Sequence, residues 1–295
     1  MNRFLNIIRW IIRQPLNRGN KHKALMRFML WQVNTRMNSY PVIIQWVNGA
    51  KLIMERGMVG ATGNLYAGLH DFEDMSFLLH LLRENDLFID IGANIGSYTI
   101  LASGAIRSKS IAIEPIPSTY KYLRNNIAIN GMEERTEPLN IGLGSSHSKL
   151  LFTNSHDVVN HVAIEGEKDT TEVPVRTLDE ILQNRACPLL IKMDVEGFET
   201  EVLLGGKKTL NNLDLKAVII ELNGSGARYG YKDSDIHSIF TSTGFLPYAY
   251  EPFTRQLTRL KTYSDESNTI YIRDVDFVCK RLKSASAYTV FGKTI

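Results

Sequence analysis

The sequence predicts an α/β protein with a doubly wound, largely parallel sheet, and three observations support this fold class. Compact apolar runs recur along the chain, which is typical of parallel strands covered on both faces. Amphipathic helical stretches separate these runs. A glycine-containing turn follows the first run directly, where doubly wound sheets bind ligands. The runs lie at residues 87–91, 110–113, 189–193 and 217–222.

The remaining elements of this domain follow in order. Asp71 and Asp74 resemble an N-terminal capping arrangement for the first helix, and Gly131 closes the third. Residues 145–175 are rich in Ser, His, Asn and Asp and are expected to form a β-rich insertion that could cover a substrate. Apolar periodicity predicts helices over residues 72–83, 98–106, 118–130, 178–184 and 198–210, and later strands over 246–251 and 269–273.

The first part of the chain has a different pattern. Apolar residues on both sides of Asn48-Gly49, a strong turn signal, predict a β-hairpin region within residues 40–65. Two helices are expected before it, over residues 4–12 and 23–33. We therefore predict a basic N-terminal extension of residues 1–69, with helices and a hairpin, and an α/β domain of residues 70–295.

The charge of the chain is unevenly distributed. Residues 1–50 contain eight basic and no acidic residues, which leaves 26 basic against 31 acidic residues and a charge of −5 for the remainder. A negative main body argues against a nucleic-acid groove across the core, so we expect no nucleic-acid partner. The two cysteines, Cys187 and Cys279, are too few for a cysteine-based metal site and fit reduced thiols of a cytosolic protein.

The basic N-terminal segment allows two interpretations. The apolar residues of positions 4–12 share one helical face, with Arg9 and Arg13 opposite, which is typical of a helix lying on an anionic membrane surface. The same pattern fits a helix packed on the protein's own core or on a partner subunit, and the oligomeric state stays open. No apolar run approaches the roughly 18 residues that span a bilayer, and no secretory cleavage site follows. We expect a cytoplasmic protein, with peripheral contact at the cytoplasmic membrane through residues 1–36 as one alternative.

The strongest local motif follows the first predicted strand. The strand delivers Asp90, and the turn then contains Gly92, Ala93, Asn94 and Gly96. Glycine permits a sharp turn and a close approach of backbone to ligand, and the helix start offers N–H groups to a carboxylate. The spacing Gly-x-x-x-Gly differs from the dinucleotide fingerprint. An aspartate ahead of the glycines would suit a ligand with a positive ammonium group and would repel a pyrophosphate. We therefore predict that these five residues bind a cofactor.

Two later positions complete the expected cofactor site. Glu114 ends the second predicted strand and is placed to accept hydrogen bonds from both ribose hydroxyls of a nucleoside. Asn140 follows the third strand, where an adenine would lie. A purely structural αβ turn is the alternative to cofactor binding.

Carboxylates gather at the ends of the next two strands. Asp194 and Glu196 follow the fourth strand, and Glu221 and Asn223 follow the fifth. Buried carboxylates need a partner, such as a cation, a substrate or Lys192. Asp194 is the first candidate for a general base, and Glu196 for an orienting group; both are assigned to the catalytic site. The alternatives are Mg²⁺ held by these four side chains, or a structural network at the edge of the sheet. His156 and His161, in the insertion, are alternative bases.

The motifs together resemble the FkbM family of methyltransferases. The resemblance covers residues 70–223 and includes Asp90 to Thr99, Ile113-Glu114-Pro115, Arg176-Thr-Leu-Asp179, Ile191-Lys-Met-Asp-Val-Glu-Gly197, Val202-Leu-Leu-Gly-Gly206 and Ile220-Glu221. It implies a Rossmann-like class I methyltransferase fold, S-adenosylmethionine as cofactor, and O-methylation of a small-molecule or glycan acceptor such as a polysaccharide or natural product. A protein that keeps the cofactor fold as a non-catalytic scaffold is the alternative. The intact glycine loop and Glu114 count against it.

Overall fold

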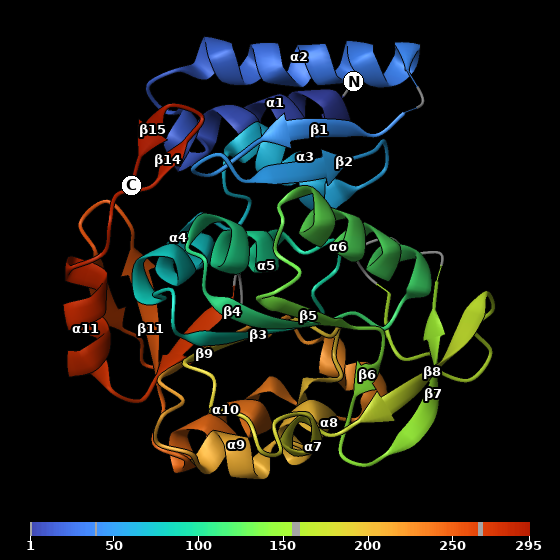
Figure 1. Cartoon of the computed structure of the whole chain (residues 1–295). Coiled ribbons are helices and arrows are strands. Elements are labelled where there is room, and N and C mark those ends of the chain that lie inside the picture. Colours follow the sequence, from blue (N-terminus) through green and yellow to red (C-terminus); the bar gives the residue numbers. More distant parts are fainter. Residues whose placement is uncertain (1, 39, 155–159, 265–267) are drawn as a thin grey trace.

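The structure is a computed structural model and describes residues 2–38, 40–154, 160–264 and 268–295. Its centre is an eight-stranded sheet with helices on both faces (Figure 1). The strand order is β12-β11-β13-β10-β9-β3-β4-β5. The strands are β3 (Leu87–Ile91), β4 (Lys109–Ile113), β5 (Thr136–Leu139), β9 (Leu190–Met193), β10 (Ala217–Ile220), β11 (Leu246–Glu251), β12 (Gln256–Arg259) and β13 (Thr269–Ile272).

The predicted doubly wound architecture is confirmed. The five strands β5, β4, β3, β9 and β10 pair in parallel, and β13 pairs antiparallel with both β10 and β11. From β3 the chain runs outward through β4 to β5 and then returns to β9 on the other side of β3. This reversal creates a switch point between β3 and β9, where doubly wound sheets bind their ligands. The residues of β9 and β10 are all buried, as continuous apolar runs predict.

Helices cover the two faces of the sheet separately (Figure 1). A large apolar cluster joins one face to the first group of helices, and a second cluster joins the other face to the second group. The first group is α4 (Phe72–Leu81), α5 (Ser97–Thr99), the π-helix η2 (Ile100–Ala105), α6 (Pro117–Ile129) and α11 (Val275–Lys283). The second is α7 (Leu178–Ile181), α8 (Glu199–Leu204), α9 (Lys207–Asn211) and α10 (Asp233–Ser242), with the short 3₁₀ helix η4 (Ser225–Tyr229) before α10.

Three helical predictions need correction. Asp71 occupies the N-cap of α4 but makes no side-chain cap hydrogen bond; its Oδ2 instead accepts from the Tyr98 hydroxyl at 3.0 Å. The helix expected over residues 98–106 is mostly π-helical. The helix expected over residues 198–210 divides into α8 and α9 at Gly205 and Gly206, two residues of low helix propensity. A Cβ at Gly205 would lie 2.1 Å from the carbonyl oxygen of Gly144, so the chain packs closely at this break.

The N-terminal segment packs over the α4 to α6 layer (Figure 1). Ile11 and Phe28 are buried in the same apolar cluster as the sheet. The C-terminal residues join this layer, since Val290 bridges Val47 and is buried. The prediction that a domain boundary lies at residue 69 stays a prediction. The elements are α1 (Asn2–Arg13), η1 (Pro15–Asn17), α2 (Lys21–Met37), β1 (Val42–Gln45), β2 (Lys51–Met54), α3 (Val59–Ala67), β14 (Thr289–Val290) and β15 (Lys293–Thr294).

Asn126 of α6 connects the N-terminal hairpin to the glycine turn, and Asn130 at the C-cap of α6 adds a second connection to the hairpin. The fully buried Asn126 accepts from the Ile53 amide of β2 at 2.8 Å and donates to the Ile95 carbonyl at 2.8 Å. One turn later, Asn130 accepts from the Lys51 amide and donates to its carbonyl. The hairpin is therefore bonded to the element that carries the predicted cofactor turn.

The segment expected as an insertion contributes to a separate three-stranded sheet, β6-β8-β7. Its strands are β6 (Gly142–Leu143), β7 (Ser148–Thr153) and β8 (Thr170–Arg176). Among the described residues, no helix is both long and apolar enough to cross a membrane.

Candidate active site

A cavity of about 410 Å³ lies beside the switch point, at the carboxyl ends of the central strands. Its walls come from the glycine turn after β3, residues 113–116 at the end of β4, and residues 194–196 after β9. Phe152 and Asn160 contribute from the separate small sheet and its neighbouring loop, and Val59 from α3. The cavity therefore occupies the ligand position of doubly wound sheets.

The glycine turn brings the ends of β3 and β9 into close contact. Gly92 has φ +75°, and a Cβ there would lie 1.8 Å from the carbonyl oxygen of Asp194. Gly96 has φ +91°, and its Cβ would lie 2.6 Å from a methyl of Leu123 on α6. Both positions therefore require glycine, the first because two backbone segments meet there.

Hydrogen bonds within the protein hold the turn. The amides of Gly92 and Ala93 donate to the Ile113 carbonyl, and the amide of Asn94 donates to the Glu114 carboxylate at 2.9 Å. The Ile95 amide donates to the Asn94 side chain, and the Gly96 amide to the Ala93 carbonyl. Each amide of residues 92–96 therefore already has an acceptor within the protein. At the helix start the Thr99 amide donates to Asp90, and the expectation that this helix start offers N–H groups to a carboxylate stays a prediction. The turn contributes shape to the cavity.

Two buried carboxylates border the turn. The Oδ2 of Asp90 accepts from the Thr99 amide at 3.0 Å and from the Thr99 hydroxyl at 2.6 Å, and burial raises the pKa of Asp90 to about 6. Glu114 accepts from the Ile116 amide at 2.9 Å as well as from Asn94, and burial raises its pKa to about 7. Both line the cavity. Each carboxylate oxygen can accept more than one hydrogen bond, so Glu114 retains acceptor capacity for a ligand.

Asn140 has a supporting position. Its side-chain amide donates to the carbonyls of Glu114 and Pro115, both at 2.8 Å. Its neighbours Ile141 and Gly142 line the cavity, but Asn140 is not among the described residues that do. The amide therefore fixes the turn after β4, and contact with an adenine stays a prediction.

Lys192 and Asp194 form an ion pair on the floor of the site. The Lys192 ammonium, on the buried strand β9, lies 3.2 Å from Oδ2 of Asp194 and 5.5 Å from the centre of the Tyr98 ring. Burial lowers the pKa of Lys192, but Asp194, Asp71 and Glu221 outweigh this effect and raise it overall. Lys192 is therefore a fixed positive charge that positions Asp194.

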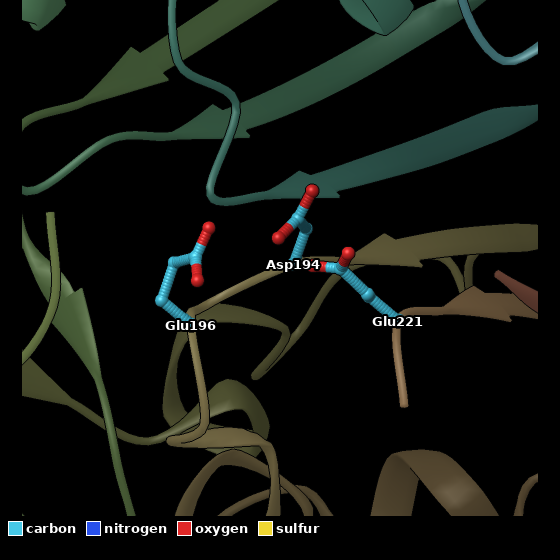
Figure 2. A group of neighbouring side chains, drawn as sticks. All are labelled: Asp194, Glu196 and Glu221. Atoms are coloured by element: carbon cyan, nitrogen blue, oxygen red, sulfur yellow. The ribbon is translucent and has the colours of Figure 1, made fainter. Parts of the chain in front are cut away.

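Asp194, Glu196 and Glu221 converge at the cavity (Figure 2). One oxygen from each lies within 4.8 Å of the others, a spacing that could hold a metal ion. Burial, followed by the charge of Asp194, raises the pKa of Glu196 to about 7 and that of Glu221 to about 8. Glu196 adopts φ +54°, an uncommon conformation for a residue other than glycine. Asn223 also lines the cavity, and its side-chain oxygen accepts from the Ser225 amide.

Sequence reasoning placed neither Glu199 nor Tyr98 at the site, and it assigned Asp71 only a capping role. Glu199 is almost fully buried and accepts from the amides of Val195 and Gly197, so it shapes the loop that carries Glu196. Tyr98 and Asp71 line the cavity as a hydrogen-bonded pair. An acid in the first helical turn, two residues after Gly197, was the signal that could have identified Glu199.

The two histidines predicted as alternative bases, His156 and His161, both belong to the insertion. His161 lies 3.1 Å from Glu167 and is outside the described set of cavity-lining residues. His156 lies outside the residues that the structure describes.

The sequence model of the Methyltransferase FkbM domain matches residues 90–247, a segment that starts at the strand of the glycine turn and includes Glu114, Asp194 and Glu221. The chain belongs to the FkbM methyltransferase family. The resemblance seen in the motifs is thus confirmed, over more than half of the chain.

Two curated relatives share part of the sequence. The chain is similar to hexuronic acid methyltransferase AglP of Haloferax volcanii, with 29% identity over 148 residues, 50% of this chain and 59% of AglP. It is similar to methyltransferase sdnD of Sordaria araneosa, with 27% identity over 169 residues, 45% of this chain by coverage and 65% of sdnD. The chain therefore spans less than two thirds of each relative. A solved structure, precorrin-6y C5,15-methyltransferase of Geobacter metallireducens GS-15, matches with TM-score 0.42 and 10% identity, over 75% of this chain and 93% of that one.

Proposed function

We propose that this FkbM protein transfers a methyl group from S-adenosylmethionine to a hydroxyl oxygen of a sugar, a polysaccharide or another natural-product acceptor. The observation that carries the proposal is that the family match falls on the residues that line the switch-point cavity. The hexuronic acid methyltransferase among the relatives supports a sugar acceptor.

The size and the charge of the cavity suit a cationic nucleoside ligand. Its volume lies within the range of small-molecule sites, about 300 to 1,000 Å³. Glu114 stands at the tip of β4 with acceptor capacity for ribose hydroxyls. The lining is strongly acidic and would stabilise a positive ligand, since the carboxylates outnumber Lys192. The acids are Asp71, Asp90, Glu114, Asp194, Glu196 and Glu221.

S-adenosylmethionine, when bound, supplies a methyl group that is already activated for displacement. The protein then has to position the acceptor, exclude water and remove the hydroxyl proton. We assign the proton to the Asp194 carboxylate, which Lys192 holds in the cavity. Glu196, which lies on the opposite side of Asp194 from Glu221 in Figure 2, would orient the acceptor hydroxyl. Asp90, Gly92, Ala93, Asn94, Gly96 and Asn140 would shape the cofactor pocket around Glu114.

Calorimetry and a transfer assay test this function. Wild-type protein should bind S-adenosylmethionine and methylate one of a panel of glycans that includes hexuronic acids. Asp194→Asn should retain cofactor affinity and lose about 100-fold or more in turnover, the usual contribution of a general base. A wild-type protein that binds no S-adenosylmethionine would contradict the proposal and favour the scaffold alternative. Full activity of Asp194→Asn would remove the base from this position.

The carboxylate triad supports a second candidate, in which Mg²⁺ at Asp194, Glu196 and Glu221 lowers the pKa of the acceptor hydroxyl. Loss of activity in a chelator, with recovery on adding Mg²⁺, would favour this arrangement over a free base. We further propose that the reaction is cytoplasmic, since Cys187 and Cys279 are free thiols. We propose no nucleic-acid partner, since the chain beyond residue 50 carries −5.

A further inference from the structure

An apolar stripe faces outward on α2. Its five side chains recur at helical spacing and are each more than half exposed, and Tyr40 is exposed just beyond the end of the helix. In Figure 1, α2 is the outermost element of the N-terminal layer. The stripe consists of Met26, Met29, Leu30, Val33 and Met37.

The opposite side of the same helix is the one that packs on the protein. Ala24, Phe28 and Trp31 are buried at four- and three-residue intervals, and the Phe28 ring lies 5.2 Å from that of Tyr66 on α3. The helix is thus anchored by its inner face and carries a second apolar face that no described element covers. Contiguous exposed apolar surface of this kind marks an interaction site.

The charges around the stripe are positive and unneutralised. Lys21 and Lys23 are exposed at the start of α2, and Arg36 is exposed near its end. No acidic residue occurs before Glu55, and within the described parts of the chain no ion pair involves a basic residue of α1 or α2. Apolar residues flanked by unpaired lysine and arginine complement a surface with anionic headgroups over hydrocarbon.

We propose that the outward face of α2 binds the surface of an anionic lipid bilayer, with the helix lying in the interface plane. The face differs from the one that sequence periodicity indicated, because Ile11 of α1 is buried and its neighbours Ile7 and Ile8 are partly covered. Val59 and Asn64 of α3 line the cavity, while Tyr66 of the same helix packs on α2. Because α3 lies between α2 and the cavity, docking through α2 would place the cavity near the membrane. An acceptor carried by a lipid could then enter the cavity.

Co-sedimentation with vesicles tests the proposal on the full chain. The probes are phosphatidylcholine vesicles with and without phosphatidylglycerol. Wild-type protein should sediment with the anionic vesicles only, and added salt should weaken this binding. The double variant Leu30→Glu with Val33→Glu should reduce the partition coefficient about 100-fold, because it removes two exposed apolar side chains that would insert into the bilayer and places two anions against an anionic surface. Lys21→Gln with Lys23→Gln should weaken binding to anionic vesicles and flatten its salt dependence.

Leu213→Glu is the matched control, since Leu213 is an exposed leucine outside the N-terminal layer. It should bind vesicles like the wild type, and all variants should keep the wild-type melting temperature. Wild-type protein that stays in the supernatant, or a double variant that sediments like Leu213→Glu, overturns the proposal. So does a lipid-free dimer that the double variant converts to monomers without any vesicle binding, because the stripe would then join two copies. The readout is independent of methyl transfer, so a protein that binds vesicles but not S-adenosylmethionine contradicts only the proposed function.

Discussion

Replacement of Gly92 by alanine should separate the two strands that form the switch point. The new Cβ would start 1.8 Å from the carbonyl oxygen of Asp194, so the backbones must move apart by about 1.5 to 2 Å to reach ordinary contact. Overpacking of this kind costs about 1 to 3 kcal/mol, and the positive φ of +75° adds about 1 to 2 kcal/mol. We expect a loss of about 2 to 5 kcal/mol in the free energy of unfolding.

The same movement displaces Asp194 from its position in the cavity. A misplacement of about 1 Å can lower turnover about 100-fold. Gly131→Ala is the matched control: Gly131 also has positive φ, at +60°, but a Cβ there meets nothing within 4 Å. Urea denaturation and calorimetry with S-adenosylmethionine should show the control losing only about 1 to 2 kcal/mol of stability and no affinity. Equal stability and equal cofactor affinity of the two variants would refute the close backbone approach.

Three further predictions concern the carboxylates. Glu114→Gln should weaken binding of S-adenosylmethionine by about 1.5 to 3 kcal/mol in calorimetry, the scale of a hydrogen bond to a charged group; unchanged affinity would place the ribose elsewhere. Glu196 and Glu221 have pKa values raised to about 7 and 8, so their carboxylate forms, which can accept a proton or a metal, appear only as pH rises. We therefore expect kcat/KM to increase through this range. A flat profile from pH 6 to 9 would contradict their participation. Burial raises the pKa values of Glu114 and Glu199 to about 7. Protonation then favours the folded state, a contribution that is fully present below the ordinary value of 4.5 and is lost as pH rises through about 7. Urea denaturation of the wild type should show this loss, and Glu114→Gln should reduce it.

The central parallel strands were predictable because their burial is nearly continuous. Residues 87–91 coincide with β3, since an apolar run between turn signals leaves little choice of boundary. Residues 246–251 coincide with β11, although burial alternates along that strand. The Gly205-Gly206 pair was a signal for the break between α8 and α9, but the close approach of Gly205 to the backbone of Gly144, some sixty residues earlier in the chain, was not predictable. Local periodicity contains no information on such contacts.

The site shows the same division. The positions of Glu114 and Asp194 at strand ends followed from the order of the motifs, since parallel strands end at one edge. The hydrogen bonds that the amides of the glycine turn donate to Ile113 and Glu114 depend on the distance between β3 and β4, which the sequence does not give. Nor could periodicity distinguish the two apolar faces of α2, because only packing determines that Phe28 points inward and Leu30 outward.

The paired hydrogen bonds of Asn126 have a practical consequence for truncated variants. Removal of the first 69 residues would take away Ile53, whose amide this side chain accepts, and would leave a buried amide half satisfied next to the glycine turn. It would also uncover the inner face on which Phe28 packs. A shortened chain would therefore lose the support of the glycine turn together with the proposed membrane-binding face of α2. Point substitutions on the outer face of α2 are therefore better suited than truncation for separating membrane binding from methyl transfer.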